Sequence, residues 1–186
     1  MAAFRAIALV GCLLAAGCNQ LLGIEDPPDD GVPAISGTYL AGLDFRSNTA
    51  LGVVVLAEAH VLYSRGEGEV TIELQPLTAA ERAPIGESWS TTAAVTAGTN
   101  ITYLSTTITG TVPQSASPGH MPFSIEGEIV GRFKDETAFC GVLTGTYWTT
   151  DKSAFMQLPS IAFGAVKTAL TTPTVEINCS GDKYTP

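Results

Sequence analysis

Four cysteines are the residues of this chain with the most readily assigned chemistry. Cys12 and Cys18 lie near the N-terminus, whereas Cys140 and Cys179 lie 39 residues apart in the C-terminal part. A structural zinc site needs several Cys or His ligands at short spacing, and the sequence has no such cluster, so we expect no metal site. In an exported chain, the simplest interpretation of the two distal cysteines is a disulfide between Cys140 and Cys179.

The histidines and the neighbouring carboxylates do not form a catalytic motif. His60 is two positions from Glu58, so a strand would place both on one face, but no nucleophile motif accompanies this possible general-base pair. His120 lies in a Pro-Gly-His-Met-Pro segment expected to be an exposed loop. Glu126 and Glu128 alternate along one strand face, where solvated carboxylates are the simpler interpretation than a glycosidase pair. We therefore predict no enzymatic activity, no catalytic residues and no cofactor.

The first seventeen residues have the pattern of an export signal. Arg5 precedes an apolar run over residues 6–16, which is too short for the ~20 residues that span a bilayer. The following Ala15-Ala16-Gly17-Cys18 resembles the lipobox of bacterial lipoproteins. The resemblance implies that residues 1–17 are cleaved and that acyl chains such as palmitate on Cys18 hold the protein in a membrane. An ordinary signal peptide that contains two cysteines is the alternative.

Residues 18–34 read as the lipidated cysteine followed by an acidic, proline-rich tether, and residues 35–186 as a single domain. Asn19 follows the lipidated position, where an Asp in Gram-negative lipoproteins favours the inner membrane. The resemblance thus implies the outer membrane, with its periplasmic or surface face left open. Short segments at residues 22–26, 139–145 and 161–165 also resemble uncharacterised lipoproteins of myxobacteria.

The charge of the chain limits its partners. The formal net charge is −9, and removal of residues 1–17 would take away one cation, Arg5, and change it to −10. Such an acidic chain is a poor match for nucleic acid or for polybasic docking on anionic lipid. Attachment to a membrane must therefore come from the acyl chains.

The composition of the domain predicts an all-β fold. Thr, Val, Ile, Gly and aromatic residues alternate in short segments with no long amphipathic helix. We expect about eight or nine strands, at residues 38–45, 51–63, 70–75, 89–96, 101–112, 123–133, 139–148, 161–166 and 174–179. Short connections and regularly spaced glycines favour an antiparallel meander closed as a lipocalin-like barrel, with a β-sandwich as the alternative. Gly37-Thr38-Tyr39 resembles the Gly-x-Trp start of lipocalins, with Tyr in place of Trp.

The sequence is compatible with two functions. In the first, the barrel encloses a small apolar ligand near a group of mostly aromatic residues: Phe123, Ile125, Phe133, Phe139, Tyr147 and Trp148. In the second, the core is filled and the outer surface binds an envelope protein or a glycan. Interior volume separates them, because inward glycines with few large residues leave a cavity, whereas interdigitated aromatic rings fill it.

Overall fold

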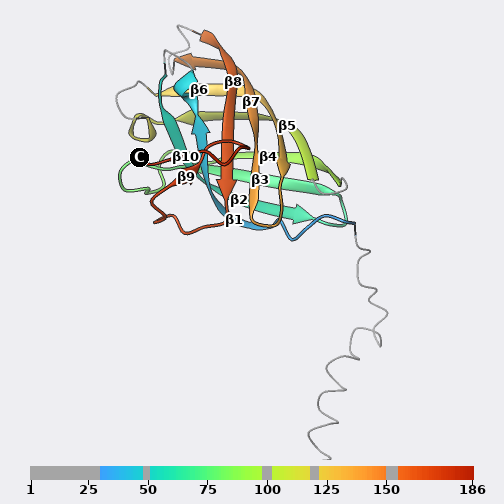
Figure 1. Cartoon of the computed structure of the whole chain (residues 1–186). Helices are drawn as coiled ribbons and strands as arrows, with labels where there is room; N and C mark the ends of the chain where they lie inside the picture. The colour runs from blue at the N-terminus through green and yellow to red at the C-terminus, as the bar shows by residue number, and fades with distance from the viewer. Residues whose placement is uncertain (1–29, 48–50, 98–101, 118–121, 150–154) are drawn as a thin grey trace, which may run out of the picture.

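The computed structural model describes residues 30–47, 51–97, 102–117, 122–149 and 155–186, which form a closed eight-stranded antiparallel β-barrel (Figure 1). Each strand pairs with the next, and β1 pairs with β8 to close the barrel. The predicted barrel meander is thus confirmed. Its strands are β1 (Gly37–Asp44), β2 (Val54–Ser64), β3 (Glu69–Pro76), β4 (Trp89–Ala97), β5 (Thr102–Val112), β6 (Phe123–Phe133), β7 (Ala138–Thr149) and β8 (Phe155–Val166).

The other regular elements are small. Two 3₁₀ turns, η1 (Phe45–Ser47) and η2 (Gln114–Ala116), lie in connections, and β9 (Val175–Glu176) pairs with β10 (Lys183–Tyr184) outside the barrel. Within the described ranges, no helix has the length and apolar character needed to cross a membrane. The export signal, Cys18 and most of the tether lie outside the described residues.

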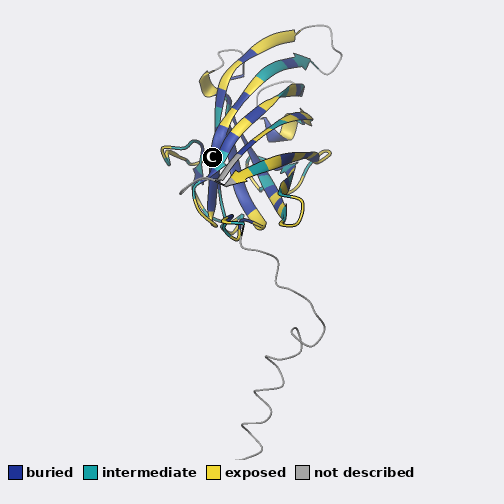
Figure 2. Cartoon of the chain, turned by 90° about the vertical axis from the view of Figure 1, so that its right-hand side faces the viewer, coloured by how far each residue is buried: buried dark blue, intermediate teal, exposed yellow. Residues whose placement is uncertain are grey.

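Alternation of apolar and polar residues determines which face of each strand is inside. In β3, Val70, Ile72 and Leu74 are buried in the barrel, whereas Glu69 and Glu73 are exposed. Figure 2 shows this alternation as buried and exposed bands along the strands. Because successive side chains point to opposite faces, the period of two in the sequence fixes the interior of the barrel.

Strand β8 is longer than the sequence suggests, since it begins at Phe155 rather than at residue 161. Its pairing with β7 shifts between Leu143 and Gly145, where Leu143 pairs with Ile161 and Gly145 with Leu158. Pro159 therefore lies in a bulge. Proline has no N–H to donate to a ladder, and a bulge tolerates it, so the strand continues past a residue that normally ends one.

The ring of Phe163 covers two inward glycines of β6 and β7. Gly131 pairs with Gly141 across these strands. A Cβ added at Gly141 would lie 2.6 Å from the Cα of Gly131 and 2.8 Å from the Phe163 ring, and one at Gly131 would lie 3.3 Å from that ring. The missing side chains therefore make room for Phe163 from β8. These glycines do not leave an empty space.

The N-terminal segment closes one end of the barrel. Val32 and Ile35 are buried in the same core as the strands. Asp30 accepts hydrogen bonds from the Tyr63 hydroxyl at 2.6 Å and from the Val32 N–H at 3.0 Å, and its carboxylate lies 3.5 Å from Arg65 Nε. The hydrogen bond from Tyr63 lowers the pKa of Asp30. Burial, followed by the hydrogen bond to Asp30, raises the pKa of Tyr63 to about 12. Residues 30–35, which include part of the predicted tether, thus contact the barrel.

The C-terminal residues 168–186, here called the C-terminal strap, pack on the outside of the barrel. The sequence suggested a ninth strand at residues 174–179, but β1 already pairs with β8, so no open edge remains there. Only Val175–Glu176 is a strand, outside the barrel. Val175 and Ile177 instead bury the outward side chains of Leu40 and Leu56 in a second apolar cluster.

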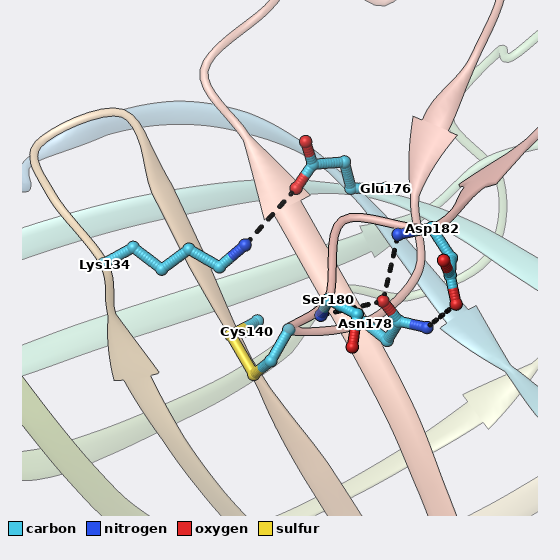
Figure 3. Close-up of a disulfide and its surroundings, with 7 residues drawn as sticks. Lys134, Cys140, Glu176, Asn178, Ser180 and Asp182 are labelled. Atoms are coloured by element: carbon cyan, nitrogen blue, oxygen red, sulfur yellow. Dashed lines mark hydrogen bonds and ion pairs between the residues drawn. A yellow bond between two sulfur atoms is a disulfide. The ribbon is translucent and has the colours of Figure 1, made fainter.

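Two further contacts hold the C-terminal strap. The predicted disulfide is confirmed: Cys140, outward on β7, is bonded to Cys179. Around it, Lys134 Nζ lies 3.8 Å from Glu176, and Asn178 donates a hydrogen bond to Asp182 at 2.8 Å (Figure 3). Near the start of the C-terminal strap, the Arg82 guanidinium donates hydrogen bonds to the carbonyls of Leu170, Thr172 and Pro173.

Removal of the disulfide should loosen the C-terminal strap and leave the barrel folded. Closure of a 39-residue loop stabilises a protein by about 4 kcal/mol in the chain-entropy model. We expect Cys140→Ala with Cys179→Ala to lower the free energy of unfolding by about 2–4 kcal/mol, measured by urea denaturation. A thiol reductant should bring the wild-type protein to the level of the variant and leave the variant unchanged. An unaltered urea midpoint in the variant would contradict this role.

Candidate functional site

The interior of the barrel is filled. Edge-to-face contacts link Tyr39 to Phe139 and Phe139 to Phe163, with ring centroids 5.0 and 6.1 Å apart, and Phe133 contacts Phe139 at 5.1 Å. The apolar cavity that remains beside Phe139 has a volume of about 20 Å³. Since one water needs about 10–15 Å³, this space holds roughly one water molecule.

The candidate ligand residues are divided between the two faces of the barrel wall. Five of them are buried in the filled core: Phe123, Ile125, Phe133, Phe139 and Tyr147. Trp148 lies on the outer face, where it pairs with Ser124 of β6 and with Phe155 of β8. Successive side chains of a strand point to opposite faces, so Trp148 points outward because its neighbour Tyr147 points inward.

The barrel wall is incomplete between β4 and β5. The ladder between these strands consists of three residue pairs, from Val95–Leu104 to Ala97–Thr102. By contrast, β5 pairs with β6 along all of its eleven residues. The rest of the two strands, as described, forms no ladder between them. Residues 89–94 of β4 diverge from the residues of β5 that follow Leu104.

Threonine side chains bridge this divergence. The Thr91 hydroxyl donates a hydrogen bond to the Thr107 carbonyl at 2.6 Å, and the Thr106 hydroxyl donates one to the Thr92 carbonyl at 2.9 Å. The Thr91 and Thr106 hydroxyls also lie 2.7 Å apart. Side chains thus satisfy main-chain carbonyls that a regular ladder would otherwise satisfy.

Trp89 fills the wider part of the gap. Its Nε1 donates a hydrogen bond to the Thr111 carbonyl at 3.2 Å, and the indole lies on the Cα of Gly110. A Cβ at Gly110 would lie 2.2 Å from Trp89 Cδ2. Gly110 is thus the residue that allows the indole to lie against β5, and Trp89 is buried as a result.

A cleft opens to solvent above this part of the wall, with a volume of about 480 Å³. It is lined by residues 87–89 at the start of β4, 109–111 of β5, 124–126 of β6 and Trp148 of β7. The floor is Trp89 and Gly110, and the outward residues of β5 to β7 form the side. The cleft therefore collects residues from four separate stretches of the chain.

The cleft combines aromatic and polar side chains and carries two carboxylates. Glu87 and Glu126 are exposed, and neither forms an ion pair with any residue that the structure describes. Thr111 Oγ1 and Ser124 Oγ lie 3.1 Å apart at its edge. The sequence pattern correctly assigned Glu126 to the outer face, but it held no signal that Glu126 would meet Glu87 and Trp148 at one site.

The remaining candidates lie elsewhere. Glu58 and His60 do share the outer face of β2, with His60 Nε2 3.7 Å from the carboxylate and Nδ1 3.2 Å from the Thr38 hydroxyl, but neither residue lines the cleft. His120 lies outside the described residues. In the described ranges, no group of three or more His, Cys, Asp or Glu side chains is placed to hold a metal ion.

Comparison of the chain with protein-family models, with curated proteins and with solved structures finds no match.

The contact between Trp89 and Gly110 is directly testable. We expect Gly110→Ala to push the indole out of the wall, to break its hydrogen bond to Thr111, and to lower the free energy of unfolding by about 1–3 kcal/mol. Urea unfolding followed by circular dichroism measures the change. Gly66→Ala is the matched control, because a Cβ added at Gly66 in the β2–β3 turn meets nothing within 4 Å. Equal stability of the two variants would show that the ring does not depend on Gly110.

Proposed function

We propose that this chain is a lipid-anchored binding module of a bacterial cell envelope and that its ligand binds in the outer cleft between β4 and β5. The observation that carries the proposal is the contrast between the two spaces: about 20 Å³ inside the barrel and about 480 Å³ in the cleft. Small-molecule sites usually have about 300–1,000 Å³, and only the cleft falls in this range.

The alternative is a carrier whose barrel encloses a small apolar molecule. Such a ligand would have to displace rings that contact one another, such as Phe139 and Phe163. Overpacking of a well-packed core typically costs about 1–3 kcal/mol, before any ligand of several carbon atoms is accommodated. The filled core therefore favours an interaction module with an external site.

The position of the tether agrees with this role. Asp30, where the described chain begins, is held by Tyr63 and Arg65 at the β2–β3 end of the barrel. The cleft lies at the opposite end, where β4 begins and β5 ends. A lipid on Cys18 would thus be attached beneath the closed end, and the cleft would face away from the membrane. With Asn19 after the anchor, we place the protein in the outer membrane.

The proposal includes no catalytic step. The acidic groups of the cleft, Glu87 and Glu126, have no His, Cys or Lys beside them among the residues that line it. A hydroxyl nucleophile needs a base beside it, and among the described residues no Ser or Thr that lines the cleft is hydrogen-bonded to a carboxylate. Recognition is the chemistry that these side chains support.

The anchor is tested by Cys18→Ser. Because the acyl chains supply the attachment, we expect the variant to move from the membrane pellet to the soluble fraction after cell fractionation and to lose incorporation of labelled palmitate. The Cys12→Ser variant is the matched control and should remain in the membrane. A Cys18→Ser protein that still sediments with membranes would show that the anchor lies elsewhere.

The location of the site is tested with soluble Cys18→Ser protein and cell-envelope fragments from the host bacterium. We expect the protein to co-sediment with the fragments and Thr109→Arg, which fills the cleft, to weaken this binding about tenfold or more. Thr107→Arg is the control, since Thr107 is exposed on the same face of β5 but does not line the cleft. Equal binding by both variants would exclude the cleft. A co-purifying small molecule in native mass spectrometry that survives Thr109→Arg would favour the carrier instead.

A further inference from the structure

The side chains of the cleft combine an aromatic surface with a dense set of hydrogen-bonding groups. Trp148 is partly exposed on the outer face of β7, and its cross-strand neighbour Ser124 lies beside the Thr111 hydroxyl at 3.1 Å. Two pairs further along the β5–β6 ladder, and so on the same face, Thr109 is opposite Glu126. Hydroxyl and carboxylate oxygens thus lie in neighbouring rows beside an indole.

These rows continue across the outer face of β7. Glu126 is opposite Thr146, and the Thr146 hydroxyl accepts a hydrogen bond from the Gln157 amide at 3.3 Å. The outward residues of β5, β6 and β7 at this end are therefore mainly hydroxyls with one carboxylate. Beside them, Trp148 adds an aromatic surface to the cleft.

The charge of the cleft excludes one large class of ligands. Glu87 and Glu126 are exposed, and in the described part of the structure neither has a cation beside it. A phosphate, sulfate or uronate group would meet two carboxylates on a chain whose net charge is already −9. Anionic ligands are therefore disfavoured, and the carboxylates are available as strong hydrogen-bond acceptors for the hydroxyls of a neutral ligand.

Binding of a peptide as an added β-strand is disfavoured at this gap. Strand addition uses unpaired main-chain groups along a sheet edge. Here the carbonyls of Thr92, Thr107 and Thr111 already accept hydrogen bonds from the side chains of Thr106, Thr91 and Trp89. Three carbonyls that an added strand would use are thus occupied, and the outward side chains of the cleft are the better binding groups.

A pyranose ring matches the hydroxyl, carboxylate and indole groups that line the cleft. It presents hydroxyls around its rim, which donate to carboxylate and hydroxyl oxygens, and a face of C–H groups, which packs on an indole. We propose that the cleft binds a neutral saccharide, with a sugar ring stacked on Trp148 and its hydroxyls hydrogen-bonded to Glu126 and to the Thr109 and Ser124 side chains. This inference rests on the cleft being the ligand site, as proposed above.

The test uses soluble Cys18→Ser protein on an array of neutral oligosaccharides with gluco-, galacto-, manno- and N-acetylglucosamine-configured units, with oligogalacturonate as the anionic probe. We expect binding to a subset of the neutral sugars and none to oligogalacturonate. Isothermal titration with the best neutral sugar then measures the affinity of the variants.

Two variants test the roles of the named residues. Trp148→Ala should weaken binding about tenfold or more through loss of the stacking surface, and Glu126→Gln about threefold to tenfold through loss of the charged acceptor. Glu128→Gln is the matched control, because Glu128 lies on the same face of β6, outside the cleft, and should bind as the parent protein does. Circular dichroism checks that each variant is folded.

The outcomes separate this inference from the proposed function. If no neutral sugar binds, or if Trp148→Ala binds as tightly as the parent, the saccharide inference is wrong. Should envelope binding still be lost with Thr109→Arg in that case, the cleft remains the site and its ligand belongs to another class, such as a peptide. Tight binding of oligogalacturonate would also overturn the inference, because it would show that the carboxylates do not exclude anions.

Discussion

Filling the inside of a closed barrel is the constraint on which the rest of this structure depends. Eight strands enclose a space just wide enough for side chains to fill. Phe163 lies over the glycine pair of β6 and β7, and Phe139 contacts rings from three other strands. Large residues on some strands thus require small ones on their neighbours, so the interior behaves as a packed core. Such a core stabilises the fold and leaves little space for a ligand inside the barrel.

The same constraint moves recognition to the outside of the wall. Where β4 and β5 diverge, the backbone alone does not close the barrel, and Trp89, Thr91 and Thr106 complete it with their side chains. Trp89 therefore belongs to the core on one side and forms the floor of the cleft on the other. Stability of the wall and shape of the candidate site depend on one indole and on the glycine that it covers.

The outer surface of the barrel is divided in a similar way. The C-terminal strap covers the apolar outward residues of β1 and β2, and the disulfide ties it to β7. No segment that the structure describes covers the outward face of β5 and β6 in this way, and Thr107, Thr109 and Glu126 are exposed there. One face of the barrel is thus closed by the chain itself, whereas the other remains polar, exposed and adjacent to the cleft.

Much of the fold could be predicted from the sequence, because the signals are local. Alternation within each strand gave the all-β meander and the outward position of Glu126, and the two cysteines outside the expected export signal and lipidation site gave the disulfide. Local patterns could not decide how full the barrel is, since the Phe163 ring that covers Gly131 and Gly141 comes from another strand. They also gave no sign that β4 and β5 diverge, or that residues 174–179 pack outside a closed sheet. Those features depend on contacts between residues far apart in the chain, and only the tertiary structure decides them.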